Sequence, residues 1–346
     1  MNTVVNEPLE HVLAEYNVDV NKITLETYKE NRAVWWVDTN RGKKILKKMP
    51  LGKKRLLFVL SAMEHLAANG VNLPKIIRTK KLAPFVEIEG TNFVLSKAVS
   101  ATPPNYNVSS QLAMIMRCIA GFHVASRGYQ PPAEANIRSH LGNWPKIYLD
   151  QINALKYFKE QAMQNKAGKF NAAFLKEYDF FINLANSCLV ALQHSPYNKL
   201  VKAAGQTVNL CHQDFAARNL GLTKKDRLYV FDTDDITYDL PSRDIRKICH
   251  EVMKKNGRWD SKQLTKMLQA YDSVNPMAPE DYAVLSIDIC FPYLFYSISR
   301  KYFSKLEKGW SEQKFVQTLI NIVNTEKSKL AVLNTALPID WPNLKP

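Results

Sequence analysis

The pattern of apolar residues changes at residues 101–105, and this change constrains the fold more than any other feature of the chain. Before it, short segments rich in β-branched and aromatic residues alternate with turns. After it, apolar residues recur on one helical face. The segment itself, Ala-Thr-Pro-Pro-Asn, neither continues a strand nor begins a regular helix. At 346 residues the chain is long enough for two lobes. We therefore predict an α+β protein with a small β-rich lobe at residues 1–100 and a larger, mainly helical lobe at residues 101–346.

The first lobe is predicted to be a small sheet with one helix. Residues 33–38 and 43–48 flank Thr39-Asn40-Arg41-Gly42, a pattern typical of two antiparallel strands and a short turn. A helix follows and ends at Asn69-Gly70. Its apolar residues recur at helical spacing: Leu56, Leu60, Met63 and Ala67. Two more strands are expected at residues 83–88 and 92–96.

The second lobe shows helical periodicity at residues 111–126, 144–163 and 172–193. Another helix is expected after residues 239–242, and Asn256-Gly257 ends it. The exceptions are residues 207–211 and 228–232, which have the pattern of short strands. Such strands place polar groups at loop ends, where chemistry usually occurs.

Three polar residues follow these two strands. Asp214 and Asn219 belong to the octet His-Gln-Asp-Phe-Ala-Ala-Arg-Asn, and Asp232 ends the run Leu-Tyr-Val-Phe-Asp. Transfer of a γ-phosphoryl group needs a carboxylate beside the attacking hydroxyl, and an amide oxygen and a second carboxylate for Mg²⁺. Asp214 alone could equally cap a helix. Asp232 favours the chemical interpretation, because a carboxylate at the end of an apolar strand needs a cation or hydrogen-bond donors.

Other polar residues near this motif have less specific patterns. His212 is expected to hydrogen-bond the loop backbone and hold Asp214 in place, rather than to act as an acid or base. One of Asp234 and Asp235 is a candidate to assist the metal. We expect Asp239 and Asp244 to be helix caps or ion-pair partners of Arg243 and Arg246.

The formal net charge of +15 predicts an anionic partner without identifying it. The densest basic cluster, residues 41–55, contains no acid. It could be a solvated strand edge and loop or a surface that faces phosphates. Nucleic-acid binding is not favoured, because aromatic and basic residues are not interleaved in a recognition motif.

The remaining composition excludes several classes of protein. Five cysteines are scattered without a Cys-x-x-Cys pair, so neither a zinc site nor a disulfide framework is indicated. The N-terminus lacks a basic segment leading into an apolar one, and no uninterrupted apolar run has the length of a membrane span. We expect a soluble protein made in the cytoplasm, with no membrane partner.

The spacing of Asp214, Asn219 and Asp232 is similar to the core of the aminoglycoside phosphotransferase and choline kinase superfamily. Three further stretches point to one family within this superfamily. They are residues 119–129 (Ile-Ala-Gly-Phe-His-Val-Ala-Ser-Arg-Gly-Tyr), 210–214 and 234–247. They resemble the spore coat protein S family of endospore-forming bacilli. The resemblance extends from about residue 25 to the last helices.

This resemblance implies a bilobal protein-kinase-like fold that binds ATP and Mg²⁺ between its lobes. It implies that Lys47 holds the α- and β-phosphates, with Asp214 as the catalytic aspartate and Asn219 and Asp232 as Mg²⁺ ligands. Glu64 is the candidate carboxylate partner of Lys47. The protein would be made in the mother cell and deposited in the spore coat, with other coat proteins as partners. The acceptor would be a hydroxyl of a small molecule, a glycan or a coat protein.

Two features depart from the family pattern. The turn at residues 30–33 lacks a Gly-x-Gly-x-x-Gly loop, and Glu64, the only acid between Leu51 and Asn69, lies about one turn late. The alternative is therefore a catalytically silent coat component that keeps the fold for assembly. Acceptor specificity is expected from residues 131–148 and 271–292, whose aromatic side chains line a pocket or pack in the core.

Overall fold

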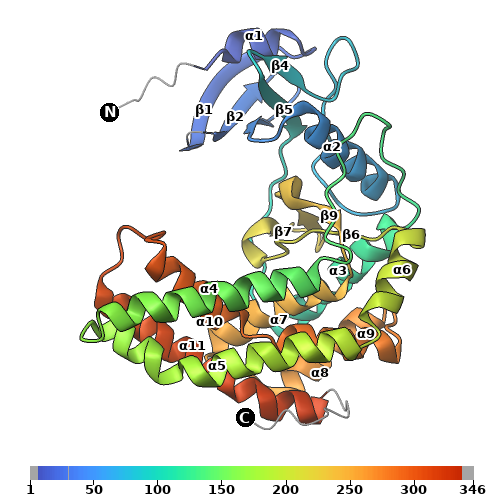
Figure 1. Cartoon of the computed structure of the whole chain (residues 1–346). Coiled ribbons are helices and arrows are strands. Elements are labelled where there is room, and N and C mark those ends of the chain that lie inside the picture. The colour runs from blue at the N-terminus through green and yellow to red at the C-terminus, as the bar shows by residue number, and fades with distance from the viewer. Residues whose placement is uncertain (1–6, 30, 337–346) are drawn as a thin grey trace. The chain divides into compact units, whose positions relative to one another are not determined.

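Five antiparallel strands pair in the order β1-β2-β3-β5-β4 near the start of the chain (Figure 1). The structure is a computed structural model that describes residues 7–29 and 31–336. The strands of this sheet are Val20–Lys29, Arg32–Thr39, Lys44–Met49, Val86–Ile88 and Thr91–Lys97. The predicted hairpin is confirmed, because β2 and β3 pair with Val37 opposite Lys44 and Ala33 opposite Lys48.

Except at β1, both faces of this sheet carry buried residues, and strand alternation divides them between two clusters. Phe93 and Leu95 pack in one cluster with Val12 of α1 (Leu9–Ala14). Val94, between them, packs in the other with Leu56 and Leu60 of α2 (Lys53–Ala68). The helix predicted from the spacing of its leucines is therefore confirmed, and it covers one face of the sheet. Its end is also as predicted, with Gly70 in the left-handed conformation at φ 94°.

Strand β1 was not predicted from the sequence. It is an edge strand, and its residues are exposed except for partly buried Ile23. Because neither face of β1 is well buried, its sequence lacks the apolar alternation that identifies a strand.

The chain divides into two units that do not follow chain order. Unit 1 contains the described residues up to Pro104, together with Gly128–Arg138 and Ala217–Ile236. Unit 2 contains Asn105–Arg127, Ser139–Ala216 and the described residues from Thr237 onward. The segment with Asn219 and Asp232 thus belongs to the same unit as the N-terminal sheet. His212 and Asp214 belong to unit 2.

Unit 2 is mainly helical, as predicted (Figure 1). Helices α4 and α5 pack against each other, as do α3 and α8, and α7 and α9. The helices are α3 Ser109–Ser126, α4 Trp144–Gln164, α5 Lys169–His194, α6 Tyr197–Thr207, α7 Ser242–Asn256, α8 Ser261–Asp272, α9 Pro279–Cys290, α10 Tyr293–Phe303 and α11 Glu312–Ala336. The predicted strand at residues 207–211 is shorter than expected, because α6 continues to Thr207 and only β6 (Leu210–Cys211) remains extended.

Helices α9 and α10 together form the one helical stretch of the described residues that is long and apolar enough to cross a membrane, with a mean hydropathy of 1.3. Within its most apolar window of 18 residues, 67% is buried. Pro292 separates the two helices. Such burial is typical of core helices.

Candidate active site

A hairpin in unit 1 brings Asn219 and Asp232 to the same end. Strands β7 (Leu220–Leu222) and β8 (Leu228–Val230) pair antiparallel, with Leu220 opposite Val230. Beyond that pair, the Phe231 N–H donates to the Asn219 carbonyl at 2.8 Å. The two residues predicted as metal ligands therefore flank the open end of one hairpin, although thirteen positions separate them.

Gly221 fixes the position of the phenylalanine that precedes Asp232. A Cβ at this glycine would lie 2.5 Å from the Phe231 ring and 2.7 Å from the Ala101 side chain. Real Cβ atoms do not approach other atoms so closely, so only glycine allows the Phe231 ring to pack on β7.

Asp232 has a left-handed backbone conformation, with φ 54° and ψ 57°. Non-glycine residues are uncommon there, and such strain is concentrated at functional sites. The Asp232 Oδ1 lies 4.0 Å from the Lys47 Nζ, and the two side chains are 40% and 34% exposed. The site thus holds a half-exposed carboxylate and ammonium close together.

The register of the second hairpin strand determines which lysine reaches this site. Lys47 of β3 lines a cavity in unit 1. Lys44 is buried instead, and its Nζ donates to the Gly42 carbonyl at 2.9 Å, while the Lys48 Nζ pairs with Glu7 at 2.5 Å. Among these three lysines, Lys47 faces Asp232.

The cavity has a volume of about 260 Å³ and is lined by both apolar and charged side chains. Much of its lining is apolar: Ile45, Met49, Leu60, Val94 and Val230. Lys47, Asp232 and Asp234 line the polar part. An apolar pocket with a few convergent charged groups is the usual form of a small-ligand site.

Asp234 is the most buried carboxylate of this cavity, with a side chain 10% exposed. Its Oδ2 lies 3.8 Å from the Arg32 Nη1. Burial raises the pKa of Asp234, the positive charge of Lys47 opposes this rise, and the negative charge of Asp232 adds to it. Lys47 therefore interacts electrostatically with both carboxylates.

Arg55 of α2 binds the backbone of the loop that carries Asp234. Its Nη2 donates to the Asp234 carbonyl at 3.2 Å and to the Ile236 carbonyl. Burial, with a smaller contribution from Arg138, lowers the pKa of Arg55 to about 10. The sequence showed Arg55 only as part of a basic cluster. Its partners lie 179 and 181 residues away, so no local pattern could reveal its role.

Glu64 is on α2 but does not face Lys47. Its carboxylate pairs with Arg78, and both side chains are more than 40% exposed. Among the described residues, Lys47 and Glu64 form no ion pair. The arrangement implied for these two residues by the family pattern is therefore not the one that the chain adopts.

In unit 2, His212, Gln213 and Asp214 directly follow β6, which pairs with β9 (Thr237–Tyr238). The backbone N–H groups of His212 and Gln213 donate to the two carboxylate oxygens of Asp244, at 2.7 and 2.8 Å. Gln213 has φ 70°, so this loop also contains a left-handed residue. The His212 Nδ1 accepts a hydrogen bond from the Asp214 N–H at 3.2 Å. This is the contact expected of a histidine that braces the loop.

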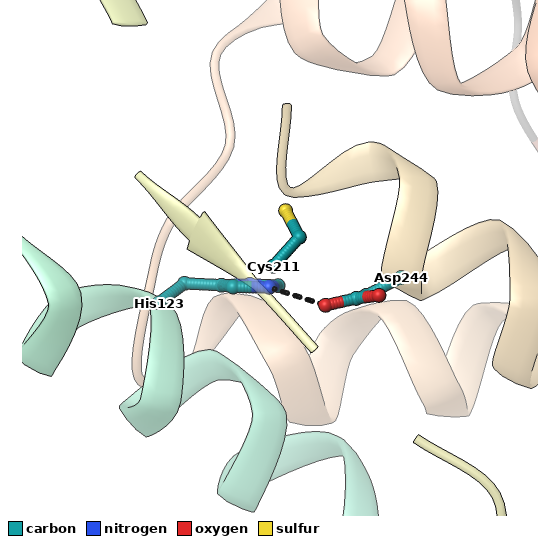
Figure 2. Close-up of side chains that lie close together, drawn as sticks. All are labelled: His123, Cys211 and Asp244. Carbon is teal, nitrogen blue, oxygen red and sulfur yellow. Dashed lines mark hydrogen bonds and ion pairs between the residues drawn. The ribbon is translucent and has the colours of Figure 1, made fainter. Parts of the chain in front are cut away.

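Asp244 is completely buried and has several hydrogen-bond partners, of which Figure 2 shows His123. The His123 Nε2 lies 3.2 Å from its Oδ2, and the His123 Nδ1 lies 2.8 Å from the Tyr271 hydroxyl. Burial acts to raise the pKa of Asp244, but the hydrogen bond and charge of His123 and the charge of Lys247 outweigh it and lower the pKa. The expectation that Asp244 is a helix cap or an arginine partner was wrong, because its carboxylate anchors a loop. Asp239 does lie 3.9 Å from Arg243, as expected.

His123, Cys211 and Asp244 have ligand atoms within 4.8 Å of one another, a spacing that could hold a metal (Figure 2). However, the Cys211 thiol donates to the Leu240 carbonyl at 3.3 Å. Burial, and then the charge of Asp244, raise the pKa of this thiol well above its ordinary value. A metal needs the thiolate. We therefore interpret the three side chains as a hydrogen-bonded brace.

Lys247 is a further residue that sequence reasoning missed. Its ammonium donates to the Gln213 backbone carbonyl and, at 2.8 Å, to the Gln213 Oε1. Burial, and then the charge of Arg246, lower the pKa of Lys247 to about 8. A buried cation thus holds the residue before Asp214.

The aromatic residues of the segments expected to set acceptor specificity pack in the core of unit 2. Trp144, Tyr148, Tyr271 and Phe291 are each fully buried. For these residues, the core interpretation of the sequence is confirmed.

The chain is similar in sequence to known spore coat proteins. Residues 14–336 match the family model described as "Spore coat putative kinase YutH". Spore coat protein S of Bacillus subtilis (strain 168) is 32% identical over 323 residues, which cover 93% of this chain and 92% of that protein. The motifs also resemble spore coat protein I, and this finer likeness stays a prediction.

Solved structures with little sequence identity have the same fold. An aminoglycoside phosphotransferase from Alicyclobacillus acidocaldarius superposes with a TM-score of 0.78 at 16% identity, over 94% of each chain. Spectinomycin phosphotransferase APH(9)-Ia, solved with ADP and spectinomycin, has a TM-score of 0.62 at 13% identity, over 93% of this chain and 96% of that one. Amicoumacin kinase hAmiN, solved with AMP-PNP and Ca²⁺, has a TM-score of 0.61 at 14% identity, over 96% of this chain and 95% of that one.

These likenesses confirm the predicted fold class, an aminoglycoside-phosphotransferase-like kinase fold with an N-terminal five-stranded antiparallel sheet followed by a mainly helical region. The extent of the family match and the 32% identity also confirm the family predicted from the motifs. The chain belongs to the family of spore coat protein S, whose family model is described as "Spore coat putative kinase YutH".

Proposed function

We propose that this protein is a spore coat phosphotransferase that uses ATP, or another nucleoside triphosphate, and Mg²⁺ to phosphorylate a hydroxyl group. One observation carries the proposal. Lys47 and Asp232 lie 4.0 Å apart beside an apolar cavity, and the backbone of Asn219 is bonded to the residue before Asp232. The cation on β3 and the carboxylate and amide that flank the β7–β8 hairpin thus belong to one unit.

The donor set fits Mg²⁺. Asn219 offers an amide oxygen and Asp232 a carboxylate, and hard divalent cations prefer such oxygen ligands. Mg²⁺ bound there would neutralise charge on the β- and γ-phosphates during transfer. Asp232 would present its carboxylate from a fixed, strained backbone, so little reorganisation is needed on binding.

The cavity lining fits a nucleotide. Apolar side chains such as Ile45, Val94 and Val230 would contact the flat base, while Lys47 would hold the phosphates. The structures of APH(9)-Ia with ADP and of hAmiN with AMP-PNP show that related folds bind such ligands, which supports this assignment.

Asp214 would orient or deprotonate the acceptor hydroxyl, because it is the carboxylate of the braced loop. His212 would hold that loop through its hydrogen bond to the Asp214 N–H. The acceptor would be a hydroxyl of a small molecule, a glycan or a coat protein. The family and the B. subtilis relative support a location in the spore coat. Synthesis in the mother cell and other coat proteins as partners are further parts of this proposal.

The test separates nucleotide binding from transfer. Calorimetry with Mg·ATP should show binding to the wild-type protein, and a coat extract should contain an acceptor for labelled phosphate. Asp214→Asn should abolish transfer and keep the nucleotide affinity, because Asp214 acts on the acceptor. The absence of both nucleotide binding and phosphate transfer in the wild-type protein would exclude the enzyme.

A catalytically silent coat component is the second candidate, favoured by the absence of an ion pair between Lys47 and Glu64. Thermal unfolding distinguishes the two. At a hundredfold excess over Kd, a ligand should stabilise the folded state by about 2.7 kcal/mol. An unchanged melting temperature with Mg·ATP would favour the silent component.

A further inference from the structure

Lys47 has no carboxylate partner on α2, yet a lysine that binds phosphates must be held in position. If unit 1 binds a nucleotide as proposed above, the carboxylate oxygens of Asp232 would bind Mg²⁺. Asp232 would then not be available as the only ion-pair partner of Lys47. We propose that Asp234 is the residue that positions Lys47 toward the phosphates, and that Arg32 is a second phosphate-binding cation drawn to the same carboxylate.

Asp234 has the placement that this role requires. It lines the same cavity as Lys47 and is buried, so its charge is poorly screened. A buried carboxylate needs cations nearby: the Arg32 Nη1 lies 3.8 Å from its Oδ2, and Lys47 lines the same cavity. Its backbone is fixed, because Arg55 donates to the Asp234 carbonyl.

Arg32 compensates for the missing glycines of the preceding turn. It begins β2, and its side chain is 51% exposed, so the guanidinium can contact a ligand while remaining 3.8 Å from Asp234. A turn without glycines does not bring backbone N–H groups close to phosphates. A guanidinium supplies several donors in a geometry that matches phosphate.

Relative to the family pattern, the helix and the loop thus supply charges of opposite sign. Instead of α2 giving a carboxylate to Lys47, α2 gives the cation Arg55 to the backbone of the loop. The loop in turn supplies the carboxylate of Asp234. Glu64, which pairs with Arg78 on the surface, is left without a role in the site.

The proposal is tested with Asp234→Asn in the full chain, with Asp235→Asn and Glu64→Gln as matched controls. Asp235 is the adjacent carboxylate, 52% exposed and paired with Arg138. Calorimetry would measure the affinities for ADP and adenosine, each with Mg²⁺ and with EDTA. We expect Asp234→Asn to weaken ADP binding about tenfold in both conditions, because a charge-assisted contact is lost. Adenosine affinity should stay unchanged, and both controls should bind like wild type.

Arg32→Ala should also weaken ADP binding without affecting adenosine. If Asp234→Asn keeps wild-type affinity for ADP, the positioning role is excluded. If the loss occurs only with Mg²⁺, Asp234 is a metal ligand and the proposal is again overturned. Unchanged ADP binding by Arg32→Ala would exclude Arg32 as a phosphate-binding cation. A wild-type protein that binds neither ligand would instead contradict the proposed function.

A second measurement does not depend on nucleotide. A double-mutant cycle between Asp234→Asn and Lys47→Met, measured by denaturant unfolding, should show coupling. The folding equilibrium constant of the double variant should differ about fivefold from the value expected if the two effects were additive in free energy. The cycle between Glu64→Gln and Lys47→Met should be additive. Additivity in the first cycle would overturn the positioning role.

Discussion

The loop before Asp214 and the loop of Asp232 are both strained, but they are held in different ways. The first is fixed by completely buried side chains, with Asp244 accepting two backbone hydrogen bonds and itself bound by His123. The second depends on charges at a partly open cavity, where Lys47 and Asp232 remain more than a third exposed. The difference suggests a division of roles. A buried network fixes a backbone before any ligand arrives, whereas exposed charges stay available to a ligand.

The largest expected effect comes from the anchor of the buried loop. Asp244→Ala should destabilise the protein by about 3–5 kcal/mol, because it removes the acceptor of two buried N–H groups and the partner of His123. Denaturant unfolding monitored by circular dichroism measures this. Asp244→Asn, which keeps one oxygen acceptor, should lose less. A loss below about 1 kcal/mol for the alanine variant would show that the network does not hold the loop.

The two loops also differ in how far sequence could predict them. Asp214, Asn219 and Asp232 were predicted from local signals, because Asp214 and Asp232 lie at the ends of strand-like runs and Asn219 lies five positions after Asp214. Asp244, Lys247 and Arg55 were missed because their partners lie 32, 34 and 179 residues away. Such contacts depend on tertiary packing, which periodicity does not encode.

The same limit applies to the fold. Strands β2 and β3 and helix α2 were predicted because one face of each is buried and produces a regular apolar spacing. Strand β1 lacks that spacing, since it lies exposed at the edge of the sheet. Sequence also could not show that residues 217–236 join the N-terminal unit, because chain order alone does not reveal which segments pack together.

The next largest effect is a pH dependence of the buried loop. Lys247 has a pKa of about 8 in the folded protein and an ordinary value of 10.5, so above pH 8 the unfolded chain binds more protons. Stability contributed through Lys247 should therefore rise with pH between about 8 and 10.5. Relative to Lys247→Met, the wild-type protein should gain about 2 kcal/mol between pH 7 and 9.5.

Denaturant unfolding of both proteins across this range would measure the difference. The charged groups acting on Lys247 are Arg246, Arg243, Asp244 and Asp239. A constant difference between wild type and Lys247→Met would mean that Lys247 keeps an ordinary pKa, so that the hydrogen bonds of its ammonium to Gln213 offset the cost of burying the charge.

A substitution that adds steric bulk tests the loop of Asp232, which is held by charges. Gly221→Ala should destabilise the protein by about 1–3 kcal/mol, because its Cβ would overlap the Phe231 ring. The displaced ring would move the neighbouring Asp232, so Mg·ADP affinity should also fall. Gly205→Ala in α6 is the matched control: nothing lies within 4 Å of its Cβ, and alanine favours helix. The control should be neutral or stabilising, and equal effects of the two variants would argue against a special role for Gly221.

The smallest effect is expected at the exposed pair between Glu64 and Arg78, which lies in the same unit as Lys47 but outside its cavity. Both side chains are more than 40% exposed, and solvent screens such pairs, so their coupling should be about 0.2–1 kcal/mol. A double-mutant cycle with Glu64→Gln and Arg78→Gln in denaturant unfolding measures it, and 1 M salt should reduce it further. The buried pair of Asp244 and His123, measured in the same way, should couple more strongly and respond little to salt. Equal coupling in the two cycles would mean that burial does not distinguish how the two regions are held.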